Sequence, residues 1–520
     1  MSGTDTPIRR ALISVSDKNG VLDLAKELAA HGALLLSTGG TAKLFRDAGL
    51  PVREVAEHTG FPEMLDGRVK TLHPKIHGGL LGRRDLPAHV AAMQEHGIPP
   101  IDLVCVNLYP FAEVTRRGCT FEEAIENIDI GGPSMLRSAA KNHDAVTVLV
   151  DPADYAVVIA EMREHRGATT LATRKRLAKK VFRTTAAYDG TIADYLGALE
   201  RSADEPFGET LHLGLERSAH LRYGENPHQK AALYGRFGEA LEQLHGKELS
   251  FNNIVDIDSA LRLMMEFAGD SRAVVAILKH NTPCGVGAGA SPREAYEKAF
   301  ATDPESPFGG ILVSNRVWDL PLAEVVDEIF SEVLIAPDFT PDALALLEKK
   351  KARRLMRWHR DRMPASELDV RSVVGGFLVQ DRDVASEDPA AGKVATKRRP
   401  SEDEAAAMSF GWKVVKHVKS NAIVFAGPDR TLGVGGGQTS RVDAVRIAIE
   451  KAKRQGLDLR GSALASDAFF PFPDGVELAL DAGATAIVQP GGSVRDDDVV
   501  AAADARGATM VMTGARHFRH

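Results

Sequence analysis

Lys279 and His280 stand together directly after the apolar run Ala273–Leu278. Histidine titrates near neutral pH and can act as a general base, and a neighbouring ammonium group can stabilise negative charge in a transition state. The order of these residues therefore predicts an acid–base site at the carboxyl end of a buried strand.

A second pair of reactive residues flanks a predicted helix. Asp129 precedes Gly131, where the helix is expected to begin, and Lys141 lies beyond its first two turns. A carboxylate and an ammonium group around an anion site can divide acid, base and oxyanion-stabilising roles. The alternative is a carboxylate that caps the helix and a solvated lysine, and spacing alone leaves both open.

Two cations lie upstream of this helix. Arg68 and Lys70 flank one valine, so an extended segment would project both to the same side, where they suit an anionic substrate. His73 and His77 have the spacing of a helical metal pair. Pro74 prevents a regular helix through both, so we expect no metal site here.

Two short loops could bind phosphate. Ser37–Thr41 (STGGT) lies between a predicted strand and a helix, and Ser14–Lys18 (SVSDK) follows the preceding strand. Ligands of α/β proteins bind at the carboxyl ends of strands, and free N–H groups at a helix N-terminus bind anions. The alternative is a pair of ordinary strand-to-helix turns with Ser and Thr caps.

Other nucleotide and metal motifs are absent or incomplete. No phosphate-binding G-x-x-x-x-G-K-[ST] motif occurs. Gly285–Ala290 has the loose form G-x-G-x-x-A, which would suit a nicotinamide-dependent dehydrogenase, but it is displaced from the end of its strand. Cys284 follows a proline as in zinc deaminases, yet Thr282 and Gly287 occupy positions that those enzymes need for Glu and Cys. We expect neither zinc nor a dinucleotide.

Composition sets further limits. The 520 residues include 64 Lys and Arg against 71 Asp and Glu, a net charge of −7, so nucleic acid is not an expected partner. Three cysteines, Cys105, Cys119 and Cys284, give no disulfide framework and suit a reducing compartment. The N-terminus resembles no signal peptide, and no apolar run approaches the ~20 residues of a membrane helix. We expect a soluble, cytoplasmic protein that binds no membrane.

The elements that must position these residues indicate an α/β fold. Short apolar runs alternate with helical stretches over the first 200 residues, which predicts a parallel sheet covered on both faces. Its expected strands are Arg10–Val15, Ala33–Leu36, Ile101–Val106 and Ala145–Val150, and its expected helices include Gly20–His31 and one from Thr41.

A polar boundary, Arg201–Thr210, precedes two further α/β lobes. Predicted strands of the first lobe are Ala273–Leu278, Ile311–Val313 and Val333–Ile335; those of the second are Ile423–Ala426, Gly461–Ala465 and Thr485–Val488. Gln380–Glu404 is predicted as a surface connection between them, and the two lobes could be an old duplication. We expect domains at 1–203 and 204–520, the latter with lobes at about 204–379 and 380–520.

Polar loops in the second part could hold a flat ligand. Arg222–Gln229 concentrates hydrogen-bond donors, and Ser466–Gly475 combines three phenylalanines with Asp467 and Asp474. Exposed aromatic rings beside carboxylates suit a heteroaromatic compound. The alternative is that the rings anchor the loop in the core.

Together these motifs resemble one family, the aminoimidazolecarboxamide ribonucleotide (AICAR) formyltransferase/inosine monophosphate (IMP) cyclohydrolases of purine biosynthesis. The matching motifs, in the family's order, are SVSDK, STGGT, DGRVKTLHP, NLYPF, IDIGG…AAKNH, RYGENPHQ, KHNTPCG, PFGGIL, KSNAIV, GGGQTSR and SDAFFPF. They extend from Ser14 to the C-terminal RHFRH.

The resemblance implies a bifunctional enzyme. The second part would transfer a formyl group from the co-substrate 10-formyltetrahydrofolate to AICAR, and the first would close formyl-AICAR to IMP with loss of water. It implies a methylglyoxal-synthase-like N-terminal domain followed by two cytidine-deaminase-like lobes without zinc. It also implies a homodimer, small-molecule partners only, and no tightly bound cofactor or metal. A ligand-sensing module is the alternative of another class, and it predicts no turnover.

The resemblance also implies roles for individual residues. For cyclisation it implies catalytic Lys70, Tyr109, Asp129 and Lys141, with substrate contacts at Ser16, Asp17, Lys18, Thr38, Gly39, Gly40, Thr41, Arg68, Thr71, Asn107 and Ile130. For formyl transfer it implies His280 as the base and Lys279 as its charge-stabilising neighbour, which counters an oxyanion or protonates the leaving nitrogen. The implied substrate contacts are Arg222, Tyr223, Gly309, Glu332, Asn421, Arg441, Phe469, Asp474, Ser493 and Arg516. Glu332 stands where some members have Asp, and Gly475 where some have Asn.

Overall fold

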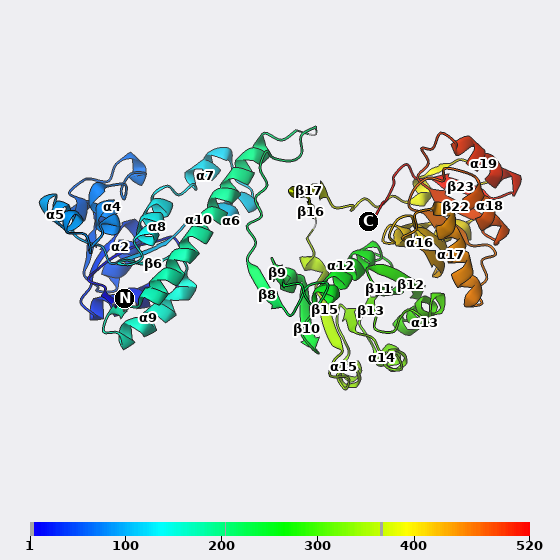
Figure 1. The fold of residues 1–520 in the computed structure, drawn as a ribbon, viewed down its shortest axis with the longest axis horizontal. Coiled ribbons are helices and arrows are strands. Elements are labelled where there is room, and N and C mark those ends of the chain that lie inside the picture. The colour runs from blue at the N-terminus through cyan, green and yellow to red at the C-terminus, as the bar shows by residue number, and fades with distance from the viewer. Residues whose placement is uncertain (1–4, 203, 365–367) are drawn as a thin grey trace. The chain divides into compact units, whose positions relative to one another are not determined.

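The computed structural model describes residues 5–202, 204–364 and 368–520. The chain forms two compact units, Met1–Gly214 and Leu215–His520 (Figure 1). The expected domain boundary at 203/204 adjoins residue 203, which lies outside the described residues.

The first unit is built on a parallel five-stranded sheet of order β4-β3-β2-β5-β6. Leu103, Val104, Cys105 and Val106 of β5 are each at most 2% exposed. Since successive side chains point to opposite faces, both faces are covered, as the apolar runs predicted. The strands are β2 (Arg10–Val15), β3 (Leu34–Ser37), β4 (Val52–Glu54), β5 (Leu103–Asn107) and β6 (Thr147–Leu149), with a separate pair β1 (Thr6–Pro7) and β7 (Ala168–Thr169).

The helices of this unit follow the predicted alternation. They are α1 (Val21–Ala30), α2 (Gly39–Asp47), α3 (Val55–Thr59), α4 (Pro74–Leu81), α5 (Pro87–Glu95), α6 (Phe111–Arg116), α7 (Phe121–Glu126), α8 (Gly131–Lys141), α9 (Tyr155–Glu164) and α10 (Leu171–Leu199).

The prediction of an extended segment around Arg68 and Lys70 is wrong. A 3₁₀ turn occupies Leu65–Gly67, and the N–H groups of Arg68 and Lys70 donate to the carbonyls of Leu65 and Gly67. Gly67 has φ +85°, a left-handed conformation that reverses the chain. The two cations are therefore placed by a turn and not by strand alternation.

The second unit contains two lobes of the same topology. Their sheets have the orders β10-β15-β14-β13-β11-β12 and β18-β23-β22-β21-β19-β20, with matching strand directions. This repetition supports the hypothesis of a duplication. The strands are β10 (Leu241–His245), β11 (Ala273–Lys279), β12 (Thr282–Gly289), β13 (Ile311–Ser314), β14 (Val333–Ala336), β15 (Arg354–Trp358), β18 (Lys393–Val394), β19 (Ile423–Ala426), β20 (Thr431–Gly435), β21 (Ala463–Ser466), β22 (Ala486–Gln489) and β23 (Thr509–Met512).

Helices cover these sheets, and two hairpin-like pairs lie outside them. The helices are α11 (Phe237–Ala240), α12 (Phe251–Glu266), α13 (Pro292–Thr302), α14 (Leu320–Asp327), α15 (Pro341–Leu347), α16 (Glu402–Val415), α17 (Arg441–Arg454), α18 (Asp474–Asp481) and α19 (Asp496–Ala505). The pairs are β8 (Arg217–Leu221) with β9 (Ala231–Tyr234), and β16 (Leu368–Val373) with β17 (Gly376–Asp381).

The glycines of Gly285–Ala290 serve packing and do not form a dinucleotide loop. They belong to β12, antiparallel to β11. A Cβ on Gly285 or Gly287 would lie 2.0 or 2.3 Å from carbonyl oxygens of α13. Gly433 and Gly435 of β20 meet α17 in the same way. Only glycine lets each helix approach its strand this closely, so the structure contradicts the dehydrogenase alternative.

The predicted surface connection Gln380–Glu404 is only partly irregular. Residue 380 lies inside β17, and Lys393–Val394 forms the edge strand β18, which pairs with β23. A two-residue strand is too short to show a hydropathy period, so the sequence carried no signal for it.

The two lobes share one hydrophobic core. Phe267, after α12, and Phe410 of α16 have ring centroids 5.3 Å apart, and buried residues of both sheets join the same cluster. Across the described residues, no helix combines the length and apolarity needed to span a membrane.

Candidate active sites

The two predicted phosphate loops meet at one edge of the first sheet. β2, β3 and β5 are parallel neighbours, so the loops after them lie together. Ser14 Oγ and Thr38 Oγ1 are 2.9 Å apart. Thr41 Oγ1 lies 3.2 Å from both the nitrogen and the oxygen of Val15, so this hydroxyl joins the two loops.

The N-terminus of α2 is open to an anion. Thr38 at its N-cap makes no side-chain capping hydrogen bond, and Gly39 begins the helix with φ +45°. A Cβ on Gly40 would lie 3.8 Å from Lys18 Nζ, which places this ammonium group over the first turn. Uncapped N–H groups and a lysine are groups that can together bind a phosphate.

Asn107 organises this edge. Its Oδ1 accepts the N–H groups of Ser16 (2.7 Å) and Asp17 (2.9 Å), and its Nδ2 donates to the Asp17 carbonyl (3.1 Å). The Asn107 side chain thus holds the Ser14–Lys18 loop in place.

Asp129, Tyr109 and Lys70 are brought together at the N-terminus of α8. Asp129 Oδ1 accepts the Gly132 N–H (2.7 Å), so the capping contact of the alternative interpretation is present. Burial raises the pKa of Asp129, against the Gly132 and Tyr109 N–H groups and the charge of Lys70, which lower it. Burial and the Asp129 charge also raise the pKa of Tyr109. A half-buried carboxyl and a cation are therefore adjacent without being fully paired.

The remaining residues of this group surround the same helix end. Lys70 Nζ lies 3.8 Å from Glu63, and Arg68 pairs with Glu126. Thr71 is buried, and its Oγ1 would lie 2.6 Å from a Cβ on Gly131. Ile130, at the N-cap of α8, is 59% exposed, so its apolar side chain is available to a ligand.

Sequence reasoning missed Tyr188 of α10. Its hydroxyl accepts the Asp129 N–H (2.9 Å) and donates to the Asn127 carbonyl (3.0 Å). Burial raises the pKa of Tyr188 to about 12, so the hydroxyl stays protonated. Tyr188 fixes the loop that carries Asp129, and no sequence signal distinguishes this tyrosine on a long helix.

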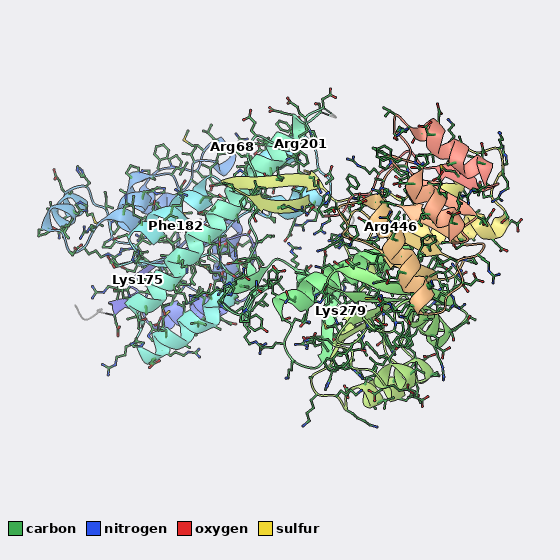
Figure 2. All side chains as sticks on the ribbon, turned by 45° about the vertical axis from the view of Figure 1, so that its right-hand side comes forward. Arg68, Lys175, Phe182, Arg201, Lys279 and Arg446 are labelled. Atoms are coloured by element: carbon green, nitrogen blue, oxygen red, sulfur yellow. The ribbon has the colours of Figure 1, made fainter. Side chains whose placement is uncertain are left out.

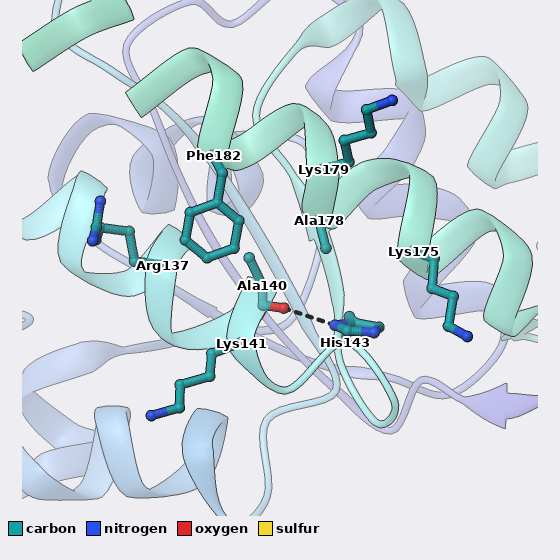
Figure 3. Close-up of a pocket in the computed structure, with 8 residues that line it drawn as sticks. All are labelled: Arg137, Ala140, Lys141, His143, Lys175, Ala178, Lys179 and Phe182. Carbon is teal, nitrogen blue, oxygen red and sulfur yellow. Dashed lines mark hydrogen bonds between the residues drawn. The ribbon is translucent and has the colours of Figure 1, made fainter. Parts of the chain in front are cut away.

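The structure does not bring Lys141 to Asp129. Lys141 is the last residue of α8, about 15 Å along the axis from the first at 1.5 Å per residue. It lines a separate pocket of about 560 Å³ (Figure 3). The pocket's other lining residues are Arg137, Ala140, His143, Lys175, Ala178, Lys179 and Phe182.

In the second unit, His280 occupies a tight turn at the end of β11. Lys279 pairs with Thr282, which leaves His280 and Asn281 as a two-residue loop with φ +53° and +64°. Positive φ at both positions is typical of a type I′ hairpin turn, for which Asn suits better than most residues. The His280 side chain is exposed, and Lys279, labelled in Figure 2, donates from Nζ to the Phe308 carbonyl at 2.9 Å.

This turn lies at the amino ends of the neighbouring parallel strands, because β11 is antiparallel to β13. Gly309, just before β13, has φ +72° and donates its N–H to the Phe330 carbonyl at 2.8 Å. Glu332, just before β14, pairs with Arg354 at 3.1 Å. Glu332 and Arg354 both line a pocket of about 530 Å³. Its other lining residues are Arg222, Lys247, Glu248, Leu249, Ser250, Phe330 and Ala352. Arg222 stacks over the Tyr223 ring at 4.6 Å.

Asn421 and Arg441 form a buried cluster in the second lobe. Arg441 donates to Asn421 Oδ1 (2.7 Å) and Ser466 Oγ (2.8 Å), and it pairs with the fully buried Asp467. Asn421 Nδ2 donates to the Gln438 carbonyl at 2.9 Å. This network lies at the carboxyl end of β21, and the loops after the parallel strands β22 and β23 lie at the same edge of the sheet.

The remaining candidates lie on those loops at the carboxyl ends of the strands. Asp474 Oδ1 accepts the Gly475 N–H (2.8 Å), Ser493 Oγ accepts the Arg495 N–H (3.1 Å), and Arg516 lies over the Phe518 ring. Of the three phenylalanines, Phe470 is buried as a loop anchor, Phe469 is half-buried, and Phe472 is 51% exposed. The anchoring interpretation is therefore confirmed for Phe470, whereas binding of a flat ligand by the more exposed rings stays a prediction.

The C-terminal tail connects the two lobe edges. Arg519 donates to Ser259 Oγ of α12 (2.7 Å), and Ser259 Oγ lies 3.3 Å from Asn281 Oδ1 in the His280 turn. His517 is 2% exposed and lies between Asp383 (2.6 Å) and Glu387 (2.8 Å). Nothing in the sequence indicated that the tail spans both lobes.

Metal ligation has no support around the histidine pair. His73 Nδ1 accepts the Lys75 N–H as the N-cap of α4, and His77 Nδ1 contacts Ser138 Oγ at 3.0 Å. Throughout the described ranges, no three His, Cys, Asp or Glu side chains are grouped to hold a metal ion.

Comparisons with known proteins agree with the sequence motifs. A family model described as AICARFT/IMPCHase bienzyme matches residues 139–451, and a model of an MGS-like domain matches residues 20–134. The chain is similar to the bifunctional purine biosynthesis protein PurH of Chloroflexus aurantiacus, with 58% identity over 512 residues and 98% of each chain covered. A solved structure titled as the crystal structure of ForH has 39% identity, covers 36% of this chain and 99% of its own, and has a TM-score of 0.32.

Proposed function

This chain belongs to the AICARFT/IMPCHase bienzyme family, and from that membership we propose how its two compact units divide the two reactions. It is a bifunctional AICAR formyltransferase and IMP cyclohydrolase of purine biosynthesis. The proposed division assigns cyclisation to residues 1–203 and formyl transfer to residues 204–520, the latter in lobes at about 204–379 and 380–520.

Cyclisation is proposed to occur between α2 and the N-terminus of α8. The open α2 terminus with Lys18 would hold the substrate phosphate, and Asp129 with its raised pKa would accept a proton as the carboxamide nitrogen attacks the formyl carbon. Lys70 would stabilise the oxyanion that forms on the formyl oxygen, and this oxygen then leaves as water with one proton from the carboxamide nitrogen and one from the formamide nitrogen. Because the reaction is intramolecular, orientation supplies much of the rate.

The proposal gives Tyr109 a role in cyclisation and gives Lys141 none. Tyr109 lies against Asp129 and would help to orient the reacting amide. Lys141 lies at the far end of α8, so we assign it no step within the site of its own chain. Its family role stays a prediction from the resemblance.

Formyl transfer is proposed to occur at the His280 turn. His280 would take the proton from the 5-amino group of AICAR as its nitrogen attacks the formyl carbon of 10-formyltetrahydrofolate. Lys279, held by the Phe308 carbonyl, would counter the oxyanion or protonate the departing folate nitrogen. The pocket lined by Arg222 and Glu332 adjoins this edge and suits the polar groups of the ribonucleotide.

The observation that carries the proposal is the meeting of Asp129, Tyr109 and Lys70 at the N-terminus of α8, in the same compact unit as the uncapped N-terminus of α2. A coupled assay with AICAR and 10-formyltetrahydrofolate tests it by following tetrahydrofolate and IMP separately. We expect both products, and formation of neither would favour the ligand-sensing alternative.

Further properties are proposed from family membership and composition. The enzyme would use 10-formyltetrahydrofolate as a co-substrate, with no tightly bound cofactor and no metal, and AICAR, formyl-AICAR and IMP as its other small-molecule partners. It would act as a cytoplasmic homodimer that binds neither nucleic acid nor membrane. The acidic net charge of −7 supports the exclusion of nucleic acid.

A further inference from the structure

Asp256 of α12 holds the turn that carries His280. Its Oδ1 accepts the Asn281 N–H at 2.7 Å. One helical turn further on, Ser259 Oγ lies 3.3 Å from Asn281 Oδ1, and Arg519 of the C-terminal tail donates to the same hydroxyl at 2.7 Å. Asn281 is thus held through its backbone N–H and its side chain, both from one face of α12.

The turn needs such support because its backbone is unfavourable. Non-glycine residues with positive φ are uncommon, and here two follow one another, His280 at +53° and Asn281 at +64°. Residues in sparsely populated backbone regions persist where their surroundings hold them, and they concentrate at functional sites. The Asp256 contact supplies that restraint at the residue next to the proposed base.

The carboxylate also interacts with the charge of His280. Burial raises the pKa of Asp256, and the Asn281 N–H and a protonated His280 lower it. Glu332 raises that pKa and Lys419 lowers it, so both charges also face this carboxylate, while Lys279 lies beside the turn.

We propose that Asp256 is a positioning residue for formyl transfer, which holds the His280–Asn281 turn in its left-handed conformation by accepting the Asn281 N–H. Asp256 does not touch the substrate in this proposal. It acts through the backbone of the turn, and the inference rests on the proposed role of His280 as the base.

Two substitutions at Asp256 test this positioning role. Asp256→Ala removes both the acceptor and the charge, whereas Asp256→Asn keeps an Oδ1 that can accept the Asn281 N–H. Asp258→Asn is the matched control, because Asp258 lies on the same helix and pairs with Arg262 and Arg382 instead. Each full-length variant is measured for kcat of formyl transfer, for KM, and for hydrogen exchange of the Asn281 amide.

Asp256→Ala is expected to lower kcat roughly 10- to 100-fold, the cost of a misplaced catalytic group, and to speed Asn281 amide exchange. Asp256→Asn is expected to restore the amide protection and most of kcat, because its Oδ1 can still accept the Asn281 N–H. Asp258→Asn is expected to match the wild type in all three measurements, and cyclisation of supplied formyl-AICAR is expected to be unchanged throughout.

Two results would overturn the inference. One is an Asp256→Ala enzyme with wild-type kcat and wild-type exchange of the Asn281 amide. The other is an Asp256→Asn enzyme whose kcat is as low as that of Asp256→Ala although its Asn281 amide is as well protected as in the wild type. If the wild-type protein itself transferred no formyl group, the proposed function would fail instead, and the exchange measurement would still report whether Asp256 holds the turn.

Discussion

Replacing Asp129 by asparagine should separate catalysis from helix capping in the first unit. The side-chain oxygen of the introduced amide can still accept the Gly132 N–H, a contact of 2.7 Å in the wild type, but an amide oxygen cannot act as the proton acceptor. We expect cyclisation of supplied formyl-AICAR to fall by roughly 10²–10⁴-fold, the usual contribution of a general base. This corresponds to about 2.7–5.4 kcal/mol at 1.36 kcal/mol per tenfold.

Stability should move in the opposite direction or not at all. Folding raises the pKa of Asp129, because burial disfavours the carboxylate more than the Gly132 N–H, the Tyr109 N–H and Lys70 favour it. The ionised carboxylate therefore lowers the free energy of unfolding at pH values above the folded-state pKa. Asparagine carries no charge, so Asp129→Asn should melt at or above the wild-type temperature at pH 7. Asp129→Ala, which loses the acceptor, should lose about 1 kcal/mol.

The assay supplies formyl-AICAR and follows IMP, with formyl transfer to AICAR measured on the same preparation as the control for the second unit. Full cyclisation by Asp129→Asn would refute the catalytic role and leave Asp129 as a helix cap only. A melting temperature of Asp129→Asn well below that of Asp129→Ala would refute the reasoning from burial.

Three further predictions concern the second unit. His280→Ala should lower formyl transfer by roughly 10²–10⁴-fold while cyclisation stays unchanged, and equal loss of both activities in a folded variant would contradict this assignment. Burial lowers the pKa of His517, but Asp383 and Glu387 raise it by more, so the pKa in the folded protein lies above the ordinary value. The stability that this gain contributes is fully present below about pH 6.5 and is lost as the pH rises through the folded-state pKa. His517→Gln should therefore destabilise at pH 6 and match the wild type at high pH in denaturant titrations, and a pH-independent difference would count against it. Gly285→Ala should cost roughly 1–3 kcal/mol, because its Cβ would lie 2.0 Å from a carbonyl oxygen of α13, whereas Gly238→Ala, with open space around it, should be nearly neutral.

The sequence by itself determined where the buried strands lie and which loops follow them. Arg10–Val15 is β2 as predicted, and the start of α2 differs from the expected helix by two residues. Such runs are readable because a strand that is buried on both faces must be apolar at every position. For the same reason, the residue pattern alone was enough to place the Ser37–Thr41 loop at the carboxyl edge of the sheet.

The sequence also determined the family, because motifs in a fixed order over the whole chain are specific even where each is short. Residue type was also enough to select the candidate general bases. His280 and Asp129 are titratable groups at the ends of predicted elements, and both lie at such ends in the structure.

Only the tertiary structure decided which of these residues meet. The antiparallel pairing of β11 with β13 places His280 at the amino ends of β13 and β14, the edge opposite to the one that a parallel strand would use. Spacing along the chain suggested that Asp129 and Lys141 share a site, but a helix of eleven residues separates them along its axis. Tyr188 and Asp256 lie on helices that are distant in sequence from the loops they hold. Their hydrogen bonds to those loops depend on packing between elements. Strand direction and helix packing are set by contacts between segments distant in the chain, so a local pattern of residues carries no record of them.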